Sequence, residues 1–125
     1  SNDDFVIFVE ELVDDEWQEL LKVLKPSEPD TVSDFIVPGA VDVDVSSTGK
    51  LVLMRHTEQW NYSIWTADAD GSNLTQLTQG PSHYLPRWNS AGTRIVFTVY
   101  DPITNDPSVS VINADGSGYH AIYQP

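Results

Sequence analysis

Cysteine is absent from this chain, so it has no disulfide, no thiolate metal ligand and no cysteine nucleophile. Basic residues are scarce: six Lys and Arg stand against 19 Asp and Glu, which gives a formal net charge of −13 at pH 7. Such a surface repels phosphate backbones, so we expect no nucleic-acid partner; it suits either plain solubility or binding to a basic protein or divalent cations. The longest apolar run, Phe5 to Val9, spans five residues, whereas a membrane-spanning helix needs about 20. We therefore expect no membrane insertion.

The remaining composition is that of a folded domain. Hydrophobic residues make up 40% and aromatic residues 10% of the 125 residues, which is enough to bury a core. This length suits one domain and is too short for a complete α/β-hydrolase, a dinucleotide-binding dehydrogenase or an eight-stranded α/β barrel. The sequence also lacks a Gly-x-Ser-x-Gly segment, which excludes a serine-hydrolase catalytic centre of that type.

The N-terminal quarter differs in pattern from the rest. Residues 5–9 include three β-branched side chains, so we favour a short buried strand there over a helix. Residues 14–25 carry apolar side chains at helical spacing and are followed by Pro26, which predicts a helix. Turn formers dominate residues 26–34, which predicts a linker or a wrapping loop. The apolar residues of the expected helix are Trp17, Leu20, Leu21 and Leu24.

From about residue 41, short β-type runs separated by turn residues occur in two copies. Gly49 aligns with Gly92 at an offset of 43, and Asp70-Gly71 aligns with Asp115-Gly116 at an offset of 45. A repeat of this length with four short strands is typical of β-propeller blades. The aligned segments are 46–54 with 89–97, 67–72 with 112–117 and 74–78 with 119–123.

These segments resemble the WD-type repeat of TolB-like β-propeller proteins. The likeness is carried by residues 86–97 and 112–117 in the second copy and by residues 64–74 in the first, and it covers roughly residues 41–124. The family usually writes its first hairpin as Ser-Pro-Asp-Gly. Here those positions read Ser-Ser-Thr-Gly and Asn-Ser-Ala-Gly, which keep the glycine that permits a positive φ in the turn.

The resemblance implies a mainly β fold with two four-stranded antiparallel blades, and the pattern of residues 14–25 adds an N-terminal helix. We divide the chain into residues 1–34, an N-terminal strand, helix and linker, and residues 35–125, a two-blade unit with blade 1 at about 41–80 and blade 2 at about 84–124. Propellers have four to eight blades, so two blades cannot close a ring. The N-terminal segment, a second copy or further blades must cover the outer faces. The expected strands are 41–45, 50–56, 62–67, 74–78, 84–88, 93–100, 108–113 and 119–123.

Five residues are candidates for a ligand or partner surface. Asp42 and Asp44 alternate with valines, which places both carboxylates on one strand face. The resemblance implies that this strand lines the propeller channel, where the two carboxylates could bind a cation or ligand. The alternative is that they form a solvated strand face. Trp60 and Tyr84 could form, with Tyr62, Trp65 and Trp88, an aromatic platform for a sugar or peptide; Trp65 and Trp88 occupy strand positions that suit the core, which leaves Trp60 and Tyr84 as the candidates. His83 is the fifth candidate, with a surface or packing role as its alternative. The three histidines are 27 and 37 residues apart and match no local metal motif, so we predict neither a metal nor a cofactor.

The function we expect is a non-catalytic protein-interaction or scaffold module with a protein partner. The alternative is a fragment of a propeller carbohydrate-active enzyme, similar to sugar-acid lyases, or of a prolyl-oligopeptidase-type propeller. Open apolar blade faces also predict a homo-oligomer, a dimer or a trimer. The TolB-like resemblance implies a periplasmic or extracellular location.

Overall fold

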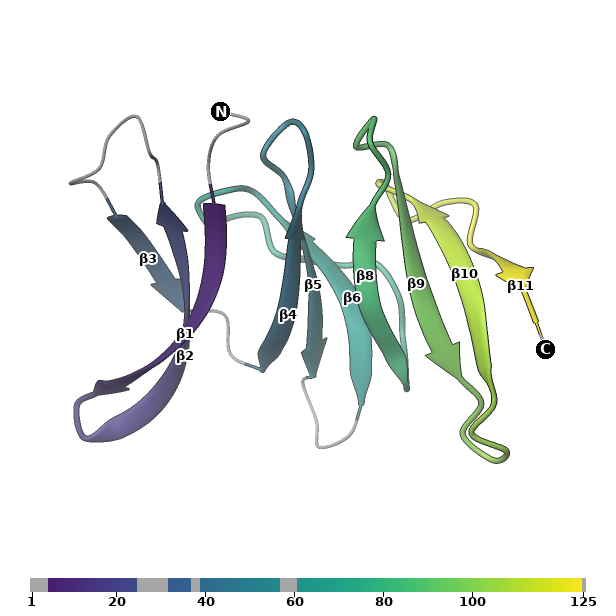
Figure 1. The fold of residues 1–125 in the computed structure, drawn as a ribbon, viewed down its shortest axis with the longest axis horizontal. Coiled ribbons are helices and arrows are strands. Elements are labelled where there is room, and N and C mark those ends of the chain that lie inside the picture. Colours follow the sequence, from purple (N-terminus) through teal and green to yellow (C-terminus); the bar gives the residue numbers. More distant parts are fainter. Residues whose placement is uncertain (1–4, 25–31, 37–38, 57–60, 125) are drawn as a thin grey trace.

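The computed structural model describes residues 5–24, 32–36, 39–56 and 61–124. Their eleven strands form three antiparallel sheets that stand side by side in chain order (Figure 1). Within this described part, no helix is long and apolar enough to cross a membrane. The mainly β fold predicted from the sequence is therefore confirmed.

Each sheet is built from consecutive strands. The N-terminal sheet consists of β1 (Phe5–Val13), β2 (Glu16–Leu24) and β3 (Val32–Ile36). The first blade consists of β4 (Ala40–Val45), β5 (Leu51–His56), β6 (Tyr62–Ala67) and β7 (Thr75–Gln76). The second blade consists of β8 (His83–Trp88), β9 (Arg94–Tyr100), β10 (Pro107–Asn113) and β11 (His120–Tyr123). All eight strands predicted for the repeats are present, with bounds displaced by two residues at most.

The helix predicted over residues 14–25 is wrong, because β2 occupies most of that segment. β1 and β2 pair antiparallel along their whole length. Asp14 and Asp15 form the turn with φ of 52° and 65°, the two-residue geometry whose twist matches hairpin strands. An isolated helix of about 12 residues is marginal in water, whereas the neighbouring strand supplies a ladder of backbone hydrogen bonds.

The other N-terminal expectations are met in part. The strand predicted at residues 5–9 is confirmed and continues to Val13. The loop predicted at residues 26–34 is wrong over its last three residues, which belong to β3 and pair with β2. The rest of that loop lies outside the described residues. Sequence reasoning underestimated residues 32–36, whose Val, Phe and Ile favour a strand.

Glycine is required in the first hairpin turn of each blade. Gly49 has a φ of 89° and donates its N–H to the Ser46 carbonyl at 2.9 Å. Gly92 has a φ of 72° and donates to the Asn89 carbonyl at 3.0 Å. Other residues take such φ values only at a cost. Because both turns keep their glycine, they form without the Pro and Asp that are usual in the family.

An aspartate side chain also organises the third hairpin of each blade. Asp70 Oδ1 accepts the Ser72 hydroxyl at 2.5 Å and the Ser72 N–H at 2.9 Å. Asp115 Oδ1 accepts the same two groups of Ser117 at 2.6 and 2.9 Å. These serine hydrogen bonds lower the pKa of both carboxyls. The repeated Asp-Gly pairs are therefore turn elements.

Two apolar clusters sit on opposite faces of the first blade. The cluster between the blades joins Val52 and Ile64 of the first blade to Ile95, Phe97 and Ile112 of the second, and all five are at most 1% exposed. Burial of each such side chain contributes about 1.5–3 kcal/mol. The cluster on the other face contains Ala40, Leu51, Leu53 and Ala67, all fully buried. The first blade is thus covered on both sides.

Candidate binding surface

Asp42 and Asp44 link the first blade to the second. The Asp42 carboxylate accepts a hydrogen bond from the Arg87 guanidinium at 2.7 Å, and this ion pair is partly open to solvent. Asp44 Oδ2 accepts the backbone N–H of Trp88 at 2.8 Å. Both aspartates lie on β4 and both partners lie on β8, so the alternating carboxylates fix the inter-blade register. Ligand binding by this pair stays a prediction.

His83 is buried at the junction of the blades, with 7% of its surface exposed. Its Nδ1 lies 2.7 Å from Thr78 Oγ1, which also accepts the Ile64 N–H at 2.9 Å. A hydroxyl oxygen can accept two hydrogen bonds and also donate one, so this contact suits either neutral tautomer of the ring. Burial lowers the pKa of His83, because it disfavours the charged ring. His83 is therefore neutral at pH 7.

Tyr84 belongs to a row of aromatic rings that crosses both blades. Its ring centroid lies 5.4 Å from that of Tyr62 and 5.5 Å from that of Tyr100. His56 extends the row, with its centroid 5.2 Å from Tyr62. All four residues lie at or near strand ends, at the end of the blades that carries the β9–β10 loop (Figure 1). Trp60, the other aromatic candidate, lies outside the described residues.

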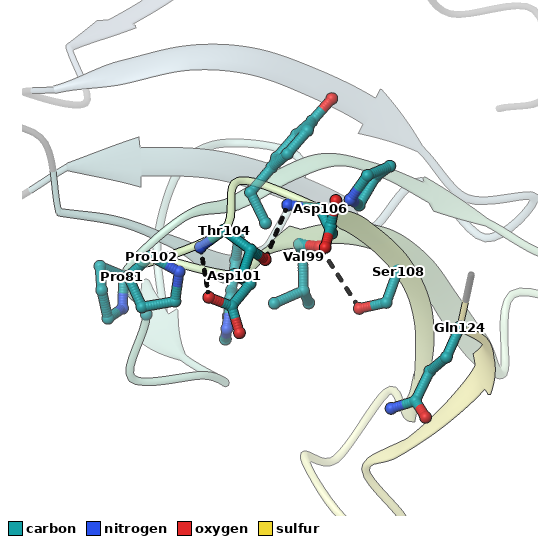
Figure 2. A pocket seen from close by; sticks show the side chains of 12 residues that line it. Pro81, Val99, Asp101, Pro102, Thr104, Asp106, Ser108 and Gln124 are labelled. Carbon is teal, nitrogen blue, oxygen red and sulfur yellow. Dashed lines mark hydrogen bonds between the residues drawn. The ribbon is translucent and has the colours of Figure 1, made fainter.

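A cavity of about 480 Å³ opens beneath the β9–β10 loop (Figure 2). Residues of that loop, of the β7–β8 connection and of the C-terminal end form its walls. Its described lining contains two carboxylates, three prolines and the buried His83, and no Lys or Arg. The lining residues are Gly80, Pro81, His83, Val99, Tyr100, Asp101, Pro102, Thr104, Asp106, Pro107, Ser108 and Gln124.

The β9–β10 loop is held by Asp101. Its Oδ1 accepts the N–H groups of Thr104 at 2.9 Å and Ile103 at 2.8 Å, the first of which is drawn in Figure 2. These two bonds, led by Thr104, lower the pKa of the Asp101 carboxyl, so it is ionised at neutral pH. Backbone bonds from Asp101 N–H to the Asp106 carbonyl and from Asn105 N–H to the Asp101 carbonyl close the loop.

A smaller cavity of about 300 Å³ is lined by Ser82, Tyr84, Tyr100 and Asn105. Tyr100 lines both cavities, whereas His83 and Tyr84 each line one of them. The structure thus gathers His83 and Tyr84 at the loop end, while Asp42 and Asp44 line neither cavity. Sequence reasoning missed Tyr100, whose only signal was its place at the end of a strand just before a turn-rich segment.

The three histidines have separate surroundings. His56 contacts Tyr62, His83 contacts Thr78, and the Nδ1 of His120 lies 2.7 Å from the carbonyl oxygen of Gly118. Among the residues that the structure describes, no group of three or more His, Asp and Glu side chains is placed to hold a metal ion.

Comparison with known proteins gives likeness at the level of structure. No family model matches the chain, and no curated protein sequence does. A TolB protein from Agrobacterium tumefaciens matches 97% of the chain with a TM-score of 0.74 and 15% identity. The propeller domain of the trilobed protease from Pyrococcus furiosus matches 98% with a TM-score of 0.70 and 12% identity. A chain of the nidogen/laminin complex matches 98% with a TM-score of 0.66 and 12% identity.

The chain has the fold of a TolB-like β-propeller. Because the matches cover 97% and more of this propeller chain, they include the N-terminal sheet as well as the two blades. The propeller chain spans 45% of the TolB chain, 39% of the trilobed protease propeller and 49% of the chain from the nidogen/laminin complex. The blades predicted from the repeat are confirmed, and the N-terminal sheet adds strands to the propeller stack in place of the predicted helix.

Proposed function

We propose that this propeller chain is a non-catalytic binding module whose loop end contacts a protein partner, in the periplasm or outside the cell. The observation that carries the proposal is the aromatic row with two open cavities beside it, at one end of both blades. Tyrosine presents a large apolar ring with a polar hydroxyl, which suits surfaces that are exposed to water and also bind a partner.

The charge of the chain supports a basic partner. A net charge of −13 attracts a positively charged protein from solution and speeds its encounter, with an effect that falls as salt rises. The carboxylates of Asp101 and Asp106 lie in the wall of the larger cavity, at the end that carries the aromatic row. The same charge opposes an anionic ligand such as nucleic acid.

The test is partner capture with matched variants. Three immobilised proteins are exposed to extracellular and periplasmic extracts of the source organism: the wild-type chain, Tyr84→Ala and the control Asp115→Asn. The control alters a hairpin of the second blade that lines neither loop-end cavity. We expect one protein, identified by mass spectrometry and confirmed with purified components, to be retained by the wild type and the control and lost by Tyr84→Ala. Equal retention by all three proteins would contradict the assignment of the loop end.

A second candidate is the propeller segment of a larger enzyme, which the likeness to the trilobed protease propeller favours. This alternative covers a peptidase and a carbohydrate-active enzyme. The protein expressed from the complete gene is assayed with acylated amino-acid p-nitroanilides and with uronate oligosaccharides. Turnover of either substrate would make this chain the accessory part of that enzyme, whereas a partner complex without turnover supports the binding module.

We also propose that a second copy covers the open face of the second blade, giving a dimer or trimer. Val96 and Leu85 of this blade are 36% and 55% exposed, whereas both faces of the first blade are buried. Repulsion between acidic chains weakens such assembly, so it should tighten as salt screens the charges. Light scattering that shows only a 13.9 kDa species in both low and high salt would contradict this proposal.

A further inference from the structure

The smaller cavity has two aromatic walls that meet near a right angle. The rings of Tyr84 and Tyr100 are inclined by 75° with centroids 5.5 Å apart, and both line the space. Tyr62 packs against Tyr84 from the first blade, with ring centroids 5.4 Å apart, so one wall is held by both blades. At about 300 Å³ the cavity is at the small end of ligand sites, a size that fits one side chain.

The polar part of this cavity is formed by two residues in strained backbone conformations. Ser82 and Asn105 have φ of 65° and 61°, a region that residues with side chains rarely adopt. The Ser82 carbonyl accepts the Tyr100 N–H at 3.1 Å, and the Asn105 N–H donates to Asp101 at 2.8 Å, so backbone bonds hold both conformations. These backbone bonds hold Ser82, Tyr100 and Asn105 around the corner.

The charge around the corner has one sign. No Lys or Arg lines it among the residues that the structure describes, and Tyr100 also lines the larger cavity beside Asp101 and Asp106. The faces of tyrosine rings carry negative electrostatic potential and attract cations placed within about 6 Å of the ring centroid. A bare metal ion does not fit this arrangement, since hard cations need several converging oxygen ligands and none of the described residues that line the corner carries a carboxylate.

We propose that the corner formed by Tyr84 and Tyr100 binds the charged end of an arginine or lysine side chain of the protein partner. This inference rests on the proposed function and names the anchor of that interface. The cation lies against the tyrosine rings, Ser82 and Asn105 offer oxygen acceptors to its N–H groups, and the carboxylates of the β9–β10 loop add attraction without being required for contact. Anchors of this kind, buried in a small pocket, carry much of the affinity at protein interfaces.

The experiment is a titration of the 125-residue chain followed by NMR of the tyrosine rings. The probes are Nα-acetyl-arginine methylamide, the lysine equivalent and the citrulline equivalent, which has nearly the shape of arginine but no charge. We expect the two cationic probes to shift the ring signals of Tyr84 and Tyr100 and to bind at least about fivefold more tightly than citrulline. Added salt should weaken the cationic probes and leave citrulline unchanged.

Three variants separate the ring face from the hydroxyl and from general effects. Tyr100→Leu should weaken arginine binding about fivefold, whereas Tyr100→Phe should retain it because the ring face remains. Tyr123→Leu removes an exposed tyrosine on β11 and should bind like the wild type. Folding of each variant is checked by its amide spectrum.

Equal affinity for arginine and citrulline, or equal losses in Tyr100→Leu and Tyr100→Phe, would overturn the proposal. Ring shifts with cellotriose but not with arginine would also overturn it and would assign the corner to a carbohydrate. If arginine fails while Tyr84→Ala still loses the captured partner, the binding module stands and only the cationic anchor is wrong.

Discussion

Truncation of Phe97 tests the packing between the blades most severely. Phe97 is 1% exposed and belongs to the cluster that joins both blades, where its ring also contacts His83 with centroids 5.4 Å apart. Replacing a buried phenylalanine by alanine costs about 3–5 kcal/mol, from lost transfer free energy and the remaining cavity. A domain of this size has a total stability of about 6–19 kcal/mol, so Phe97→Ala should lower the melting temperature by at least about 10 °C.

The adjacent residue on the same strand is the matched control. Val96 is 36% exposed and alternates to the opposite face of β9, so Val96→Ala should cost about 1 kcal/mol or less. Free energies of unfolding are measured by urea titration with tryptophan fluorescence, at protein concentrations over which the unfolding midpoint does not change. Costs for Phe97→Ala and Val96→Ala that agree within about 1 kcal/mol would refute the packing of Phe97 between the blades.

Three further predictions use the same assay. Asp44→Ala should cost about 1–3 kcal/mol because it leaves the Trp88 N–H without its carboxylate, and a cost near zero would contradict the inter-blade role of this bond. Burial lowers the pKa of His83, so the unfolded chain binds the proton more tightly than the folded chain. The free energy of unfolding should therefore fall as pH drops below 6.5, the usual histidine pKa, and level off below the pKa of the folded state. The pH profile of His83→Gln should lack this fall, and identical profiles for variant and wild type would refute the burial of His83. Gly39→Ala and Gly49→Ala both place a side chain at positive φ, which costs about 1–2 kcal/mol. Only at Gly39 does the new Cβ meet a backbone carbonyl, so Gly39→Ala should be clearly less stable than Gly49→Ala. Equal costs would contradict the close approach at Gly39.

The repeat half of the fold was predictable because its signals are local and occur twice. A glycine at a fixed place in each copy marks a turn that needs positive φ, and Gly49 and Gly92 both have it. Strand bounds then follow from the apolar runs between turns. Because the two copies resemble each other, the blade assignment is stronger than one based on either copy alone.

The N-terminal sheet could not be assigned in the same way. The apolar residues of 16–24 suit a helix face and also a strand packed on both sides, and periodicity cannot distinguish the two. The decision was made by pairing with β1, a contact between segments that spacing within one segment does not record. The turn at Asp14 and Asp15 gave a weak signal, since the common hairpin pair places glycine second.

The sequence places Tyr84 and His83 near one end of a blade, because they stand at the start of a predicted strand; that they bind a ligand or partner stays a prediction. The alternation of Asp42 and Asp44 predicted either a ligand site or a solvated strand face, but their bonds to β8 depend on how the blades stack, which one strand does not reveal. Tyr100 was missed because its neighbour Tyr84 lies on another strand and is brought next to it only by the sheet.

The two blades stack with one apolar cluster between them and present a common loop end. Nuclear Overhauser effects between methyl groups and aromatic rings test this stacking most directly. We predict cross-peaks from the methyl groups of Val52 and Ile64 in the first blade to Ile95, Ile112 or the ring of Phe97 in the second. Cross-peaks confined to residues within each blade would contradict the stack, and with it the surface from which a binding function is inferred.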